Sequence, residues 1–152
     1  RPDDIEIRAD LAKALLAAGR DDDALTLAQG ADLPALARIE AWVRQQSGEK
    51  AQAIAAYARV LQGEPTDAAS WNNVGNIHAA AGNVDQAITA FEHAITYQPD
   101  EPGMYLNLAD VLRLADLGGP RLKVARDVAE IAPICAMNSW AHATAQPPTA
   151  PI

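Results

Sequence analysis

The sequence of 152 residues has few aromatic side chains and little positive charge. Phe, Trp and Tyr make up 5% of the residues, whereas alanine alone accounts for more than a fifth of them, a composition that favours close-packed helices over a sheet. Lys and Arg number 12 against 20 Asp and Glu, which leaves a net charge of −8. Nucleic acids and anionic membranes both attract basic surfaces, so the composition argues against either kind of partner.

Cysteine and long apolar runs are also scarce. Cys135 is the single cysteine, so no internal disulfide can form. The cysteine content therefore does not indicate whether the protein works in an oxidising or a reducing compartment. No stretch approaches the roughly 18 uninterrupted apolar residues of a membrane span, and no apolar core follows a basic start at the N-terminus. We therefore expect no membrane insertion and a cytoplasmic location, with the periplasm as the alternative. Because the chain opens on Arg1, we expect it to be processed or part of a longer protein.

An internal repeat organises most of the chain. Pro65, Pro99 and Pro133 are evenly spaced, and each follows an apolar stretch with helical spacing. Proline lacks an amide donor and clashes with the preceding turn, so each of these prolines predicts the end of a helix. One period reads Trp71-x-x-Val74-Gly75-x-x-His78, followed by Ala87-x-x-x-Phe91, Ala94 and Pro99.

This pattern and its period resemble the tetratricopeptide repeat, a hairpin of two helices that recurs about every 34 residues. The resemblance implies an all-α, right-handed solenoid of about four hairpins with a C-terminal capping helix. We expect a repeat domain over residues 1–146, with units at about 5–33, 34–67, 68–101 and 102–135, a capping helix at about 136–145 and a flexible tail at 147–152. A lone hairpin cannot bury its apolar stripe, so stacking of the units should stabilise the array.

Small residues mark where paired helices should approach closely. Gly75 and Ala87 lie on the predicted apolar stripes of the third unit, which leaves room for the facing helix. Gly82 follows the first of these helices, at a position that suits a left-handed C-terminal residue.

The residues that usually carry chemistry do not form a pattern. Three histidines and one cysteine stand at unrelated spacings, so no zinc site is predicted. His78 falls on a core stripe and His93 on the outer helix, where packing and solvation explain them. No phosphate loop or linked nucleophile and base is present. We therefore expect no enzyme activity, no metal and no cofactor.

The remaining candidate for function is the concave surface of the predicted solenoid. In stacked repeats the first helix of each unit lines the concave side, and its residues off the core stripe should face a groove. Across the four units these residues are Ala9, Asp10, Lys13, Leu16 and Ala17; Arg38, Ile39, Trp42, Gln45 and Gln46; Asn72, Asn73, Asn76, Ala79 and Ala80; and Leu106, Asn107, Asp110, Arg113 and Leu114.

Eight residues of this set are the predicted contacts of a peptide or protein ligand: Arg38, Trp42, Asn72, Asn73, Asn76, Asn107, Asp110 and Arg113. Trp42 would be the anchor, and asparagine amides suit hydrogen bonds with a peptide backbone. Asn73 and Asn107 share one slot in consecutive units, which is similar to the asparagine ladder in the superhelix of O-linked N-acetylglucosamine transferases. Two alternatives stay open: the asparagines are simply solvated, or they bridge adjacent helices. A basic peptide is a further possible ligand, because the carboxylate of Asp110 is predicted to face the groove.

The predicted function is a protein-protein interaction module, similar to a bacterial adaptor or scaffold. Two alternatives remain at this point. The repeats could dock substrates for a larger enzyme such as a glycosyl- or sulfotransferase, or serve an envelope or cytochrome c assembly factor. Ile5, Leu11 and Leu15 of the first helix should be incompletely covered, so self-association through the repeat ends is a further expectation.

Overall fold

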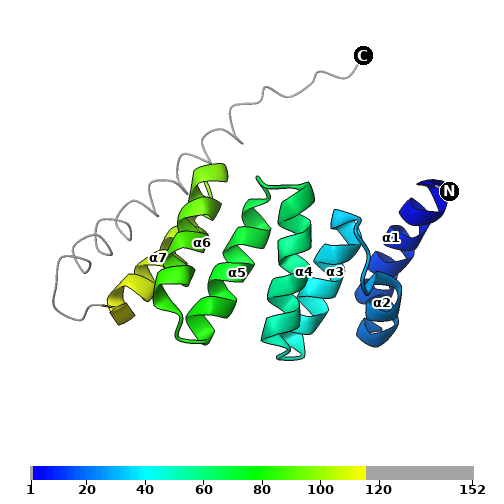
Figure 1. The fold of residues 1–152 in the computed structure, drawn as a ribbon, viewed down its shortest axis with the longest axis horizontal. Helices are drawn as coiled ribbons and strands as arrows, with labels where there is room; N and C mark the ends of the chain where they lie inside the picture. The colour runs from blue at the N-terminus through cyan, green and yellow to red at the C-terminus, as the bar shows by residue number, and fades with distance from the viewer. Residues whose placement is uncertain (1, 116–152) are drawn as a thin grey trace, which may run out of the picture.

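The computed structural model describes residues 2–115, and helices in that part of the chain follow one another in a row (Figure 1). Their bounds are α1 (Pro2–Ala17), α2 (Asp21–Ala28), α3 (Pro34–Gln46), α4 (Lys50–Gly63), α5 (Ala68–Ala80), α6 (Val84–Tyr97) and α7 (Pro102–Ala115). The predicted second helix of the fourth unit, the capping helix and the tail lie outside the described residues, as do Pro133 and Cys135.

The helices pack as hairpins that stack along the chain. α1 contacts α2, α3 contacts α4 and α5 contacts α6, and the second helix of each pair also contacts the first helix of the next pair. α7 packs on α6 and touches α5. The fold is therefore the all-α solenoid of helical hairpins that the repeat predicts.

Glycine and proline set the ends of the helices. Gly48 and Gly82, which occupy equivalent positions in consecutive units, follow α3 and α5 with φ angles of 79° and 77°. This left-handed conformation costs glycine little and other residues more, so it turns the chain into the second helix of the hairpin. α4 and α6 end shortly before Pro65 and Pro99, at Gly63 and Tyr97.

The closest approach of two helices occurs at Gly75. A Cβ atom built on Gly75 would lie 2.6 Å from Cε1 of the Phe91 ring, which is fully buried. Ala87 is also fully buried. The prediction that the third unit needs a small residue at Gly75 is confirmed: the Phe91 ring occupies the space that a side chain would take.

A buried carboxylate joins the first two hairpins. Glu40 of α3 is 5% exposed, and its oxygens accept hydrogen bonds from the Gly30 amide at 2.9 Å, from Nε of Arg44 at 2.9 Å and from the Arg59 guanidinium at 2.5 Å. Burial opposes ionisation of Glu40, but these donors outweigh it and hold its pKa below the usual value. Glu40 thus links the α2–α3 loop, α3 and α4.

Candidate functional site

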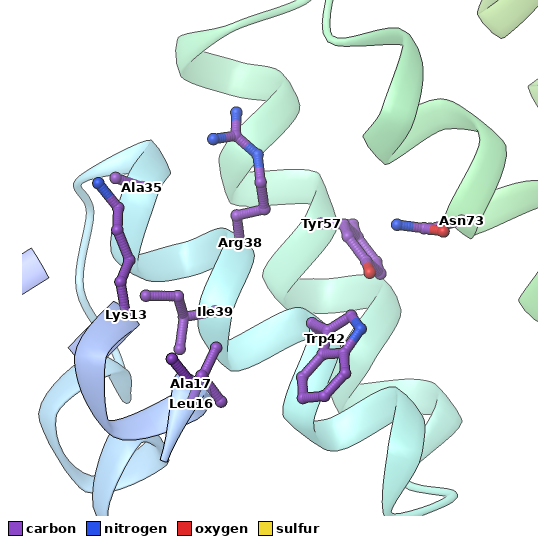
Figure 2. A pocket seen from close by; sticks show the side chains of 9 residues that line it. All are labelled: Lys13, Leu16, Ala17, Ala35, Arg38, Ile39, Trp42, Tyr57 and Asn73. Carbon is purple, nitrogen blue, oxygen red and sulfur yellow. The ribbon is translucent and has the colours of Figure 1, made fainter. Parts of the chain in front are cut away.

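A pocket of about 580 Å³ lies between the first helices of the first two hairpins. Figure 2 shows it extending from Lys13 on one side to Asn73 on the other, with Ile39 between them. Its lining residues come from α1, α3, α4 and α5: Lys13, Leu16, Ala17, Ala35, Arg38, Ile39, Trp42, Tyr57 and Asn73. Most of them belong to the set that the repeat phase assigns to the groove; Ala35 and Tyr57 do not.

Trp42 is the largest side chain of the pocket wall that remains open to solvent. It is 41% exposed, although Ala41 and Val43 on either side of it are buried. Its indole N–H has no hydrogen-bond partner among the described residues. Trp42 therefore lies off the core stripe, as the helix phase predicts, and its role as an anchor stays a prediction.

Tyr57 reaches the pocket from α4, the second helix of its hairpin. The residue is fully buried, and its hydroxyl donates to Oε1 of Gln45 at 3.0 Å. Burial raises the pKa of Tyr57 to about 12, against a smaller opposing effect of a hydrogen bond with Asn73. The phenol is thus neutral at physiological pH. No sequence signal pointed to its place in the pocket, because a residue of the core and a residue at the floor of a pocket lie on the same face of a helix.

Arg38 is engaged within the protein. Its guanidinium donates to Glu64 at 2.6 Å and to Asp67 at 2.9 Å, both in the loop between α4 and α5, while its stem lines the pocket. Asp67 also accepts a hydrogen bond from the Ser70 hydroxyl at 2.6 Å. Burial opposes ionisation of Asp67, but Ser70 and Arg38 outweigh it and the pKa of Asp67 lies below its usual value. Arg38 therefore fastens the second hairpin to the third.

Acid should weaken the stacking of these hairpins. The pKa values of Glu40 and Asp67 are lowered in the folded state, so the unfolded chain takes up protons first as the pH falls. We expect urea unfolding midpoints to be constant above about pH 5 and to decline below about pH 4. The double variant Glu40→Gln/Asp67→Asn should be less stable at pH 7 and show a shallower decline. Asp10→Asn, at an exposed surface pair, is the control. An equally steep decline in the double variant would refute this prediction.

The four asparagines differ in their surroundings. Nδ2 of Asn107 donates to Oδ1 of Asn72 at 3.0 Å and so joins α7 to α5. This is the helix bridge that the sequence left open as an alternative for these residues. Asn73 lies at the pocket, with its amide toward Tyr57 (Figure 2). Asn76 is half-buried and has no hydrogen-bond partner among the described residues. Asn76 therefore has the least committed amide, whereas the Asn73 amide already interacts with the Tyr57 hydroxyl of α4.

The remaining predicted contacts lie on α7. Asp110 and Arg113 are both exposed and form an ion pair with each other at 2.5 Å. They are separate from the α1–α3 pocket, whose lining they do not join. Of the wider predicted groove set, Ala9 and Ile39 are buried, at 4% and 6% exposure. Packing of α1 and α3 in one apolar cluster covers them, although Ile39 still reaches the pocket floor.

Apolar side chains of α1 are open to solvent. Ile5, Ile7 and Leu11 are 43%, 65% and 51% exposed, whereas Leu15 packs against the first apolar cluster. Self-association through this helix stays a prediction.

Within residues 2–115, no group of three or more His, Cys, Asp or Glu side chains is placed to hold a metal ion. His93 is exposed and stacks on Trp71, with ring centroids 4.5 Å apart. His78 is half-buried, with its Nδ1 atom covered. None of the helices in that range is both long and apolar enough to cross a membrane.

Stacked hairpins with a constant repeat period and an open face along their first helices define a helical-repeat solenoid. A family model of the tetratricopeptide repeat matches residues 40–102 and 75–138, which together span more than half of the chain. The chain belongs to the tetratricopeptide repeat family. Repeats of this fold form scaffolds for protein interactions.

Solved structures of MamA have a similar fold. One crystal structure of MamA is 19% identical, with a TM-score of 0.82 over 92% of this chain and 82% of that chain. Another is 21% identical, with a TM-score of 0.76 over 99% and 81%. A MamA RS-1 double mutant is 15% identical, with a TM-score of 0.78 over 91% and 79%. At these identities the likeness shows the fold alone. No curated protein sequence matches the chain.

Proposed function

We propose that this protein binds an extended peptide segment of a protein partner along the face formed by the first helices of its hairpins. The pocket between α1 and α3, with the exposed Trp42 indole in its wall, is the observation that carries the proposal. Pockets that bind small groups are concave and mostly apolar, with a few polar groups that fix orientation. This pocket has that composition, and the proposal assigns it binding and no catalytic step.

Neutral hydrogen bonds would hold the peptide backbone next to the pocket. The Trp42 indole N–H is open to an acceptor, and the Asn76 amide offers both donors and an acceptor. Trp42 and Asn76 occupy the same slot in consecutive units, and Asn73, one helical turn before Asn76, lines the pocket. Asn72 and Asn107 would act indirectly, because their mutual hydrogen bond sets how α5 and α7 lie together.

The test is capture of partners by the wild-type chain and by variants of the pocket. Trp42→Ala should weaken binding by about 2 kcal/mol, which is roughly 30-fold, because tryptophan anchors commonly dominate an interface. Asn73→Ala and Asn76→Ala should each cost about 1 kcal/mol, the net contribution of a neutral hydrogen bond. Circular dichroism and thermal melting establish that each variant is folded, and biolayer interferometry on the captured partner gives the affinities.

Tyr97→Ala is the matched control for the anchor. Tyr97 is also an aromatic residue with 41% exposure, but it lies on α6 and outside the pocket lining. We expect this variant to bind with wild-type affinity. Folded Trp42 and asparagine variants that retain every partner at full affinity would place the binding surface elsewhere on the molecule.

A further inference from the structure

The pocket beside Trp42 is large and mainly apolar. At about 580 Å³ it falls within the range of roughly 300–1,000 Å³ typical of ligand pockets. More than half of its lining residues are apolar and come from α1 and α3: Leu16, Ala17, Ala35, Ile39 and Trp42. Figure 2 shows Leu16 and Ala17 at the end of α1 facing the α3 side of the pocket, where Trp42 and Ile39 lie. A peptide backbone alone would leave this space empty.

The two cations at the pocket are matched by carboxylates of the protein itself. Nζ of Lys13 lies 3.3 Å from a carboxylate oxygen of Asp10, and the Arg38 guanidinium is shared between Glu64 and Asp67. Arg38 with its two carboxylates carries a net charge of −1, and Lys13 with Asp10 carries none. An acidic ligand would therefore have to compete with groups already in place, and the pocket offers no unbalanced positive charge to attract it.

Apart from Lys13 and Arg38, the polar groups that line the pocket are neutral. The Trp42 indole donates without carrying charge, and the Asn73 amide both donates and accepts. The Tyr57 hydroxyl is protonated at physiological pH, as a phenol ordinarily is, and burial raises its pKa further, to about 12. A ligand here meets an apolar cavity with neutral hydrogen-bonding groups at its edge.

We infer that this pocket takes one bulky, uncharged side chain of the bound peptide, such as leucine, methionine or phenylalanine, and so selects partners by an apolar anchor. The inference rests on the proposed function and adds the class of segment recognised. Apolar burial provides the affinity and the neutral groups fix the backbone on either side. Binding should accordingly depend little on salt, since no ion pair with the ligand is formed.

The probes are short peptides of glycine and serine, acetylated and amidated at their ends, with one central Phe, Leu, Ser, Glu or Lys. Titration into the ¹⁵N-labelled chain follows the Trp42 indole N–H by NMR. We expect saturable shifts with the Phe and Leu peptides, at least tenfold weaker binding of the other three, and less than a twofold change in Kd between low and high NaCl concentration. Saturation is expected in the millimolar range, because one side chain supplies most of the affinity.

Two variants, each replacing an alanine by phenylalanine, distinguish the effect of filling the pocket from the effect of adding a ring elsewhere on the surface. Ala17→Phe places a ring in the pocket from an exposed position on α1 and should weaken the Phe peptide at least tenfold. Ala55→Phe adds the same ring at an exposed position on α4 outside the lining and should leave Kd within twofold. If Ala17→Phe does not fold, Ala35→Phe fills the pocket from α3.

The inference is overturned if the Phe and Leu peptides give no saturable shift, if the Glu or Lys peptide binds as tightly, or if filling the pocket has no effect. A charged peptide that shifts the Asn73 and Asn76 amides would overturn the apolar anchor and leave peptide binding along this face intact. Partners that survive Trp42→Ala, Asn73→Ala and Asn76→Ala at full affinity would overturn the proposed function itself.

Discussion

Replacing Gly75 by leucine should lower the free energy of unfolding by about 3 kcal/mol, the upper end of what overpacking a core usually costs. The first atom of the new side chain already lies 2.6 Å from the Phe91 ring, and two further ring atoms lie at 2.8 and 2.9 Å. Phe91 is fully buried and cannot swing into solvent, so the α5–α6 hairpin itself has to open. Urea unfolding followed by far-ultraviolet circular dichroism measures the loss.

Gly103 provides the matched control for the smaller substitution to alanine. Gly75 lies in the middle of α5 and Gly103 in the first turn of α7, where a Cβ meets only the carboxylate end of Glu101, at 3.3 Å. Alanine favours a helix over glycine by about 1 kcal/mol, so Gly103→Ala should be neutral or stabilising, whereas Gly75→Ala should destabilise. Phe91→Leu in the Gly75→Ala background should recover part of the loss. If Gly75→Leu unfolds at the wild-type urea concentration, the close contact of α5 with α6 is wrong.

The repeat phase predicted a close approach of the two helices at Gly75, because that approach is local to one hairpin. Gly75 and Phe91 belong to helices joined by a short turn, and Gly82 fixes that turn. Periodicity and spacing therefore suffice to predict that Gly75 faces the second helix, whereas the structure shows that the Phe91 ring fills the space there. The same reasoning placed Trp42 at the surface, since its neighbours fill the core stripe of α3.

The partners of the polar side chains could not be predicted in this way. Arg38 was assigned to a ligand, yet its carboxylates come from the α4–α5 loop, 26 and 29 residues further along the chain. Asn107 reaches across 35 residues to Asn72. Long side chains on a solenoid can contact the preceding or the following unit, and helical phase gives the direction of a residue without its partner.

Glu40 shows the same limit inside the core. Counting back one period from Val74 puts Glu40 on the core stripe, and Arg44 follows in the slot of His78. A charged residue on an apolar stripe has to be paired or to reach solvent. The phase places Glu40 on the stripe without giving its partners: the Gly30 amide and Arg59 come from the neighbouring loop and helix, and only the packed structure brings them to Glu40.

Replacing Glu40 by alanine should lower the free energy of unfolding by about 3 kcal/mol, because removing one partner of a buried ion pair strands the others. Arg44 and Arg59 would keep their charges at 13% and 26% side-chain exposure, and the Gly30 amide would lose its acceptor. The partial exposure of Arg59 allows water to reach it, which holds the loss at the lower end of the range for buried pairs. Urea unfolding at pH 7 measures it.

Glu49→Ala is the control, since Glu49 is the same residue type and bonds the same Arg44 at 2.5 Å, but is 41% exposed. Exposed ion pairs contribute about 0–1 kcal/mol, so this variant should stay close to the wild type. Glu40→Gln should fall between the two, because the amide oxygen can keep one acceptor position while the charge is lost. The loss in Glu40→Ala should also shrink below about pH 4, where the wild-type carboxylate is protonated in the unfolded chain. Equal losses for Glu40→Ala and Glu49→Ala would mean that burial does not strengthen this network, and that the first two hairpins are joined by apolar packing alone.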